Sequence, residues 1–208
     1  MFLPVLSSVL ILVLVIALVN KRNQHRIDDG MKAFWEKERA ANSVRRQSLD
    51  GLDYINIPES FFSFPRDASD HDCSEAVRML ESLRGEKIVN LSGISNTDLK
   101  LKYGPANLPD LSRFDENYTS LARSLQLYAS FLAKKGCRAE ACEILEFALG
   151  TDTDVTASYR LLCSLYLEAE DQEKAESVLA RAKHPGRLGF SSLVSDLQEL
   201  IDRAASEN

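Results

Sequence analysis

The first nineteen residues of the chain contain no charged side chain, and a basic segment, Lys21 to Arg26, follows them. The run from Phe2 to Val19 consists of apolar or small residues, and as a helix it is about 27 Å long. The hydrocarbon core of a bilayer is about 30 Å thick, so this length is just enough to span it. The sequence therefore predicts a transmembrane anchor over residues 1–20.

A cleavable signal peptide is the main alternative for this segment. Such a peptide carries positive charge before its apolar run and small residues at a cleavage site after it. Here the positive charge follows the run, and Ala17-Leu18-Val19 is a poor cleavage site. Because basic residues that flank a span tend to stay in the cytoplasm, we expect a single-pass membrane protein with its N-terminus outside and its soluble domain in the cytoplasm. The alternative is an extracytoplasmic domain with a cleaved signal.

Charge is distributed unevenly along the chain. Residues 20–46 contain eight Lys and Arg against four Asp and Glu, a net charge of +4. The whole chain has a net charge of −6, so residues 47–208 carry −10. An acidic domain argues against nucleic-acid binding, which requires a basic surface. The expected partners are the bilayer, through residues 2–19, and a protein or peptide at the membrane.

Residues 21–72 are predicted to form a basic juxtamembrane helix over 28–42 and then an extended aromatic arm. Pro58 and Pro65 bracket the Phe61–Phe64 cluster and discourage a long helix there. Burying each aromatic ring contributes about 1.5–3 kcal/mol. The arm is therefore expected to pack across the helical body, and the alternative is a partner-binding peptide.

Helices are predicted on both sides of a segment rich in turn signals. Apolar residues at helical spacing predict one helix over Ser74–Arg84, which Gly85 ends, and a last one over Ser191–Ala205. Between them, Lys87–Leu111 is turn-rich, with one or two helical turns expected at Asn96–Tyr103.

The second half of the chain contains a pattern that recurs after 34 residues. Each aligned pair matches large with large or small with small. The pairs are Leu125 and Tyr159, Ala129 and Cys163, Leu132 and Tyr166, Ala141 and Ala175, Leu145 and Leu179, and Ala148 and Ala182. Small residues allow two antiparallel helices to approach closely, and large residues fill the adjacent space.

This order of residues resembles the tetratricopeptide repeat, a helical hairpin of about 34 residues. The resemblance covers about residues 122–187, and Gly136 of the first unit has Glu170 as its counterpart where the family usually has glycine. It implies an all-α, antiparallel helical stack within residues 73–208, closed by a C-terminal capping helix. The alternative fold is another all-helical bundle with alanine-rich contacts. The whole chain also looks like small single-pass bacterial proteins of unassigned role.

Catalytic motifs are missing from the sequence. It contains no glycine-rich phosphate loop, HExxH, GxSxG or supported pair of carboxylates. The four cysteines form no CxxC pair. His71, with Asp70, Asp72 and Cys73, has the residue types of a metal site, but a solvated loop is the preferred interpretation. We therefore predict no catalytic residue, cofactor or metal.

The combined features predict a membrane-tethered protein–protein interaction module, an adaptor or scaffold. In the tetratricopeptide family the first helix of each unit lines a concave binding face, so the resemblance implies a partner-binding groove there. Its residues, chosen by helical phase, are Gln126, Ser130 and Lys134 in the first unit and Arg160, Ser164 and Leu167 in the second.

An enzyme with a site in the 86–118 segment is the alternative from a different class. Its available polar groups lie in this segment and in the arm. They are Tyr54, Asn96, Asp98, Tyr103, Asn107, Asp115 and Tyr118. A pocket that gathers several of these side chains would favour an enzyme, whereas their dispersal would argue against one.

Overall fold

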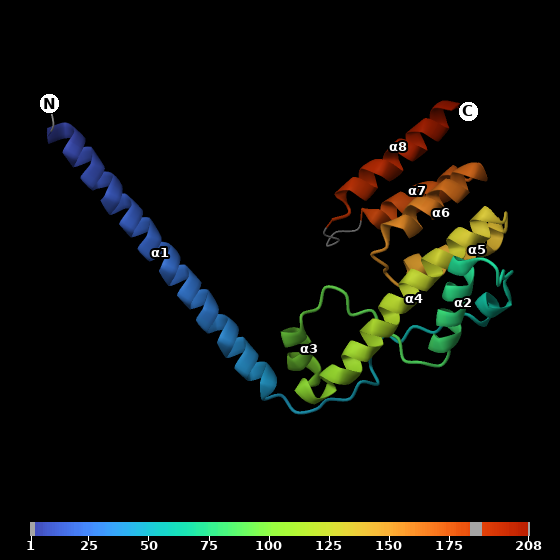
Figure 1. Cartoon of the computed structure of the whole chain (residues 1–208), viewed down its shortest axis with the longest axis horizontal. Helices are drawn as coiled ribbons and strands as arrows, with labels where there is room; N and C mark the ends of the chain where they lie inside the picture. The colour runs from blue at the N-terminus through green and yellow to red at the C-terminus, as the bar shows by residue number, and fades with distance from the viewer. Residues whose placement is uncertain (1–2, 184–188, 208) are drawn as a thin grey trace. The chain divides into compact units, whose positions relative to one another are not determined.

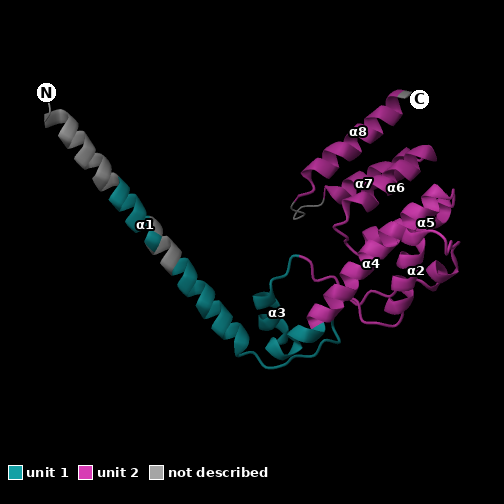
Figure 2. Ribbon diagram, in the orientation of Figure 1, with its two compact units in different colours: residues 1–51, 93–110 teal, residues 52–92, 111–208 magenta. Residues whose placement is uncertain are grey.

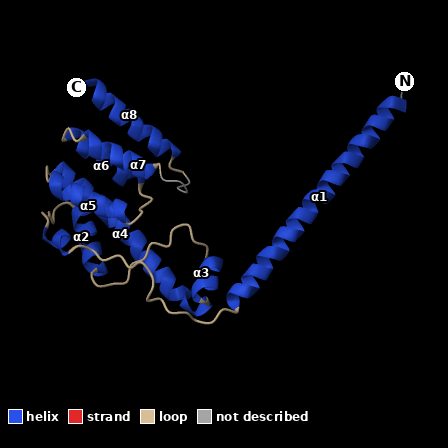
Figure 3. Cartoon of the chain, turned by 180° about the vertical axis from the view of Figure 1, so that it is seen from behind, coloured by secondary structure: helices blue, strands red, loops and turns tan. Residues whose placement is uncertain are grey.

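A computed structural model of the 208-residue chain gives its fold. The structure describes the backbone of residues 3–183 and 189–207, and their side chains except those of residues 3–15, 23, 25–28 and 207. All regular structure in this part of the chain is helical (Figure 3). The prediction of an all-α fold is therefore confirmed.

The helices fall into two units (Figures 1 and 2). Unit 1 contains residues 1–51 and 93–110, and unit 2 contains residues 52–92 and 111–208. In chain order the elements are α1 (Leu3–Asn42), the 3-10 helix η1 (Glu59–Ser63), α2 (His71–Leu83), α3 (Asn96–Tyr103), the 3-10 helix η2 (Pro105–Asn107), α4 (Leu108–Lys134), α5 (Arg138–Gly150), α6 (Thr156–Glu168), α7 (Gln172–Ala182) and α8 (Ser191–Glu207).

Helix α1 is continuous, so the apolar N-terminal run and the helix predicted over 28–42 form one element of 40 residues. Most of the run of residues 2–19 has side chains outside the described residues. In the described part, the apolar side chains from Ile16 to Val19 are followed at once by Asn20 and Lys21.

Among the described residues, no helix is long and apolar enough to cross a bilayer. A spanning helix requires about 20 consecutive apolar residues, and the described stretch of α1 becomes polar and charged after Val19. This finding overturns the predictions of a transmembrane anchor over residues 1–20 and of a single-pass protein with a cytoplasmic domain.

Charged side chains join the C-terminal end of α1 to α3 within unit 1. Glu38 is half-buried, and its carboxylate accepts a hydrogen bond from Thr97 Oγ1 at 2.7 Å and pairs with Lys100 Nζ. Beside it, Lys37 Nζ lies 2.7 Å from Asp98 Oδ1. The hydrogen bond from Lys100, followed by that from Thr97, lowers the pKa of Glu38. These contacts hold α3 against α1.

Both ends of α3 are set by its sequence, and its bounds agree with the prediction. Ser95 caps the N-terminus, because its hydroxyl oxygen accepts a hydrogen bond from the Asp98 amide at 3.2 Å. Gly104 ends the helix with a φ of 85°. A Cβ at this position would lie 2.6 Å from the Arg45 carbonyl oxygen. Only glycine fits here, since both the backbone conformation and the neighbouring carbonyl exclude a side chain.

Asn107 ties three segments of unit 1 together, and its side chain is fully buried. Its Nδ2 donates to the carbonyl oxygens of Gln47 and Tyr103, each at 2.7 Å. Its Oδ1 accepts from Arg46 Nε at 2.8 Å. Because all of its hydrogen-bonding groups are used, the buried amide stabilises the fold rather than costing energy.

Replacing Asn107 by alanine is expected to weaken unit 1 locally. The change removes the hydrogen bonds from Nδ2 to the Gln47 and Tyr103 carbonyl oxygens, and only the Tyr103 oxygen keeps another donor, the Gln47 amide. This loss costs about 1–3 kcal/mol of local opening free energy. Hydrogen exchange of the α3 amides should accelerate accordingly. The exposed Asn96 provides a matched control, since Asn96→Ala should leave these rates almost unchanged. Equal α3 protection in both variants would contradict the role of Asn107.

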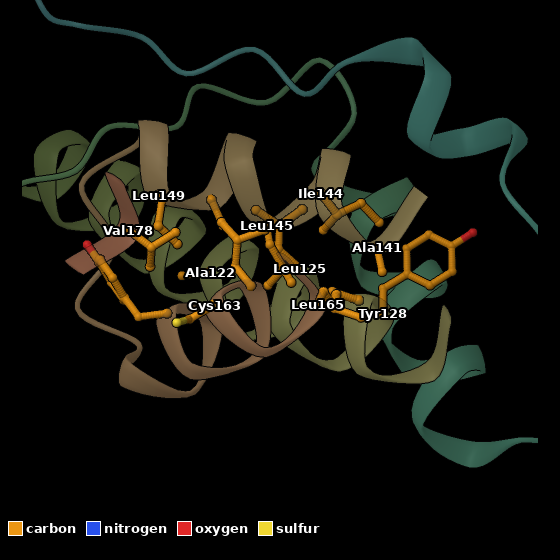
Figure 4. Packing of buried hydrophobic residues seen from close by; sticks show 14 of the residues in the cluster. Ala122, Leu125, Tyr128, Ala141, Ile144, Leu145, Leu149, Cys163, Leu165 and Val178 are labelled. Atoms are coloured by element: carbon orange, nitrogen blue, oxygen red, sulfur yellow. The ribbon is translucent and has the colours of Figure 1, made fainter. Parts of the chain in front are cut away.

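The repeated pattern lies in the core of unit 2 (Figure 4). Every residue of the six aligned pairs is buried, and none is more than 7% exposed. Alanine and cysteine side chains occupy the close contacts of α4 to α7, and leucine and tyrosine side chains fill the space beside them. The small and large positions of the sequence pattern thus match the packing.

Helix α8 packs against α6 and α7 and confirms the predicted last helix. Its buried side chains include Leu193 and Leu197. These residues follow Tyr159 and Cys163 by another 34 positions. Phe190, just before α8, packs edge-to-face on Tyr159 with ring centroids 5.4 Å apart. The period of the pattern therefore continues into α8.

The aromatic arm packs on unit 2, as the sequence predicts. Phe61 is 1% exposed, and its ring lies 5.3 Å from that of Phe147 in α5. The Ile55 amide donates to the Ile88 carbonyl at 2.9 Å. Near the end of the arm, Tyr128 Oη donates to the Pro65 carbonyl at 3.2 Å. Burial of apolar side chains stabilises a segment that forms little regular structure.

Thiol reactivity should report this packing. Cys73 and Cys163 are buried, whereas Cys137 and Cys142 are half-buried. Burial raises the pKa of Cys163 to about 11 and also raises that of Cys142. Only the thiolate reacts, so at about pH 7.5 we expect Cys137 to be alkylated first and Cys163 only after unfolding.

The measurement is mass spectrometry of tryptic peptides after short exposure to a thiol reagent. Cys137→Ser should remove the fast phase and leave the slow phases intact. Rapid modification of Cys163 in the folded protein would contradict the burial of its thiol.

Candidate partner-binding face

Helices α4 and α6 are joined by a polar network that contains two of the predicted binding residues. Ser158 Oγ donates to Gln126 Oε1 at 2.6 Å, and Gln126 Nε2 donates to Ser130 Oγ at 3.0 Å. Ser158 is fully buried, whereas Gln126 and Ser130 are half-buried. The structure therefore brings Gln126 and Ser130 together at the junction of the two helices.

The sequence analysis missed Ser158, although the repeat carried a signal for it. Ser158 follows Ser124 by 34 residues, and both serines are buried. Ser124 Oγ donates to the Ser120 carbonyl within α4 at 2.8 Å, whereas Ser158 donates to the neighbouring helix. Of the two repeated serines, only Ser158 thus makes a polar contact that crosses between helices.

Arg160 joins α6 to α8. Its Nη2 and Nε lie 2.6 and 3.0 Å from Asp196 Oδ2, and its Nη1 donates to Thr156 Oγ1 at 3.0 Å. Both side chains of the ion pair are nearly half exposed. The charge of Arg160, predicted as a contact for a partner, is therefore directed to a carboxylate of this chain.

The other predicted residues differ in their exposure. Ser164 and Leu167 are half-buried on α6, and Leu167 packs against the core. Lys134 is exposed in the last turn of α4. Glu168, beside Leu167, pairs with Arg138 at 2.8 Å. The face therefore has a cationic part on α4 and a more apolar part on α6.

Arg123 adds a second cation to the face. It precedes Gln126 by three residues, and Lys134 follows Ser130 by four, so all four share one side of α4. Arg123 and Lys134 are both exposed, and within the described residues neither forms an ion pair. The same helical phase that selected Gln126 would have found Arg123.

A second polar network joins α5, α6 and α7. Tyr166 Oη donates to Glu146 Oε1, and Arg181 Nη1 lies 3.2 Å from Glu146 Oε2. Lys174 Nζ lies 5.4 Å from the centroid of the Tyr166 ring. Burial, followed by the contact with Glu146, raises the pKa of Tyr166 above its usual range. The phenol therefore stays protonated as a donor, and the network is structural.

A cavity of about 250 Å³ lies between residues 55–59 of the aromatic arm and residues 83–88, which include the end of α2. Arg84 forms an ion pair with Glu59 at its edge, through Nε–Oε1 at 3.2 Å and a second contact. The Arg84 guanidinium also lies 4.8 Å from the centroid of the Phe62 ring. The charges of Arg84 and Glu59 at this edge are thus paired with each other.

The polar groups of the alternative enzyme site divide between the two units. Unit 1 contains Asn96, Asp98, Tyr103 and Asn107, and unit 2 contains Tyr54, Asp115 and Tyr118. In unit 2, Asp115 Oδ1 accepts from the Leu91 amide at 3.0 Å, and Tyr118 Oη donates to the Thr151 carbonyl at 3.1 Å. These two contacts fix backbone segments in place, and none of the seven side chains lines the cavity between residues 55–59 and 83–88.

The cluster around His71 is a helix start. Asp70 Oδ1 accepts from the Cys73 amide at 2.9 Å and caps α2. Cys73 is buried, and its sulfur accepts from the Asp67 amide at 3.4 Å. The part of the chain that the structure describes holds no group of three metal-binding side chains.

No family model, curated protein or solved structure matches this chain. Its architecture, within residues 3–183 and 189–207, is that of an all-helical protein.

The ion pair of Arg160 generates a prediction about α8. Arg160→Ala should accelerate hydrogen exchange of the α8 amides by up to about fivefold, because half-exposed ion pairs contribute modestly. Lys134→Ala removes a cation from the same face without touching α8 and should leave this exchange unchanged. Unaltered α8 protection in both variants would show that Asp196 does not hold Arg160 in solution.

Proposed function

We propose that this protein is a protein–protein interaction module whose α4 and α6 bind a segment of a partner protein. The observation that carries the proposal is the pair of exposed cations on α4, Arg123 and Lys134, for which the described residues provide no ion pair. Gln126 and Ser130 lie between them on the same side of the helix. Such a row supplies charge at both ends and hydrogen-bonding groups in the middle.

The repeated architecture supports the same proposal. The aligned pairs of the 34-residue pattern are buried throughout α4 to α7, as the proposed relationship to the tetratricopeptide repeat requires. That resemblance implies that the first helix of each unit, α4 and α6, contributes the binding face. Helical repeats commonly present extended binding surfaces of this kind.

The spacing of the cations suggests the chemistry of the partner. Arg123 and Lys134 are eleven residues apart, which corresponds to about 16 Å along a helix. An extended peptide covers this distance in about five residues. We therefore expect a segment with two carboxylates about five residues apart, since carboxylates pair with Arg and Lys.

Crosslinking and affinity capture of the full chain in cells tests this function. Arg123→Glu/Lys134→Glu should lower recovery of a defined partner by about tenfold or more, because two attractive contacts become repulsive. Arg78→Glu/Arg203→Glu is the matched control, with the same change of charge at exposed positions on α2 and α8. It should retain the partner.

Two results would contradict the proposal. A partner that binds both double variants equally would place the binding surface elsewhere on the chain. A full-length chain that captures no defined partner would argue against an interaction module.

A further inference from the structure

Two arginines precede an exposed serine in the segment that follows α1. Residues 45–49 read Arg-Arg-Gln-Ser-Leu. Of all serines and threonines in the chain, Ser48 alone has two lysines or arginines among the three residues before it. Ser48 and both arginines are exposed, and this segment forms no helix or strand. A hydroxyl group on such a surface segment is accessible to an enzyme that modifies it.

The two arginines supply a recognition signal for one class of enzyme. In an extended chain they lie within about 10 Å of the serine on its N-terminal side. Carboxylates pair well with guanidinium groups, and protein kinases select their substrates by charge patterns around the hydroxyl. Within the described residues Arg45 forms no ion pair, so its guanidinium group is available to an acidic substrate cleft.

Arg46 is held by unit 1, although its side chain is 65% exposed. Its Nε donates to Asn107 Oδ1 at 2.8 Å, and its Nη2 lies 3.4 Å from Asp110 Oδ2. The backbone next to it is held as well. The Gln47 amide donates to the Tyr103 carbonyl at 3.0 Å, and the Gln47 carbonyl accepts from Asn107 Nδ2 at 2.7 Å. These contacts must open locally before the segment enters the cleft of a kinase.

We propose that Ser48 is phosphorylated by an arginine-directed serine kinase, and that Asn107 limits the access of this kinase to the segment. Ser48 Oγ attacks the γ-phosphorus of Mg²⁺-bound ATP held by the kinase. A bond forms between Oγ and phosphorus, the bond from phosphorus to the β–γ bridging oxygen breaks, and ADP leaves with the electron pair. The hydroxyl proton passes to a carboxylate of the kinase.

The modification is a property in addition to the proposed function. Ser48 belongs to unit 1, whereas the residues proposed to bind a partner belong to unit 2. Neither the phosphorylation nor its test depends on the face of α4 and α6.

Phosphorylation changes the turn that Ser48 makes. Ser48 Oγ donates to Asp50 Oδ2 at 2.7 Å, and the Asp50 amide donates to Ser48 Oγ at 3.1 Å. The phosphate ester has no hydroxyl proton to donate, and its charge of about −1.5 to −2 repels the Asp50 carboxylate. The turn therefore opens, and the phosphate pairs with the guanidinium group of Arg45 instead. The modification thus acts on the segment through which unit 1 continues into unit 2.

A kinase assay on the full chain tests the site. The probe is a purified arginine-directed serine kinase with Mg²⁺ and ATP, and mass spectrometry locates the phosphate. Phosphate should appear at Ser48, and Ser48→Ala should abolish it. Arg45→Ala should lower the rate about 10-fold, because it removes a recognised charge and leaves the contacts of Arg46 in place. Arg78→Ala, at an exposed position on α2, is the matched control and should leave the rate unchanged.

Two results of this assay would overturn the site. One is a full chain that carries no phosphate at Ser48. The other is an Arg45→Ala variant that is phosphorylated as fast as the unsubstituted chain.

Asn107→Ala tests the control of access. A synthetic peptide of residues 42–53 is the reference, because it lacks the contacts with unit 1. The full chain should be phosphorylated about 10-fold more slowly than the peptide, since local opening precedes the reaction. Asn107→Ala should bring the full chain to within about threefold of the peptide, whereas Asn96→Ala should leave its rate unchanged.

Hydrogen exchange of the α5 to α7 amides checks that unit 2 stays folded in the Asn107→Ala variant. Equal rates in Asn107→Ala and the unsubstituted chain would overturn the role of Asn107 in access. A full chain that reacts as fast as the peptide would overturn it as well.

Discussion

Close approach of helices through small side chains is the constraint on which unit 2 depends. The small side chains of this core include those of Ala129, Ala141, Cys163 and Ala175, and all four are fully buried. A larger residue at these positions would separate neighbouring helices and strain the packing. The polar links of α4, α6 and α8 depend on the same approach, because hydrogen bonds as short as the 2.6 Å contact of Ser158 require adjacent helices.

The sequence predicts unit 2 well because close packing leaves a pattern that can be read without a structure. It predicts the start of α4 poorly. Leu111, Phe114 and Tyr118 have helical spacing and are buried, but the turn signals around Gly104 and Pro105 favoured a loop. For a similar reason the sequence predicts two helices where α1 is one. The change from apolar to basic residues near Asn20 indicates a boundary, but charged residues alone do not end a helix.

The candidate site was predictable only to the level of helical phase. Phase selected Gln126 and Ser130 on α4 and overlooked Arg123, which has the same periodicity. It could not reveal that Arg160 faces Asp196, because this contact joins residues 36 positions apart on different helices. Side-chain pairs between helices depend on the tertiary arrangement, whereas phase reports only which side of one helix a residue occupies.

Gly104 has a consequence for how this sequence can diverge. Its positive φ and the nearby Arg45 carbonyl oxygen exclude every other residue. Of the two preceding residues, Lys102 is exposed and Tyr103 is half-buried, and neither needs a positive φ. During divergence of this sequence, glycine at position 104 would therefore be retained, whereas the exposed positions of α3 that make no contact with α1 could change. The close approach of residues 45–46 to the end of α3 thus depends on the absence of a side chain at position 104.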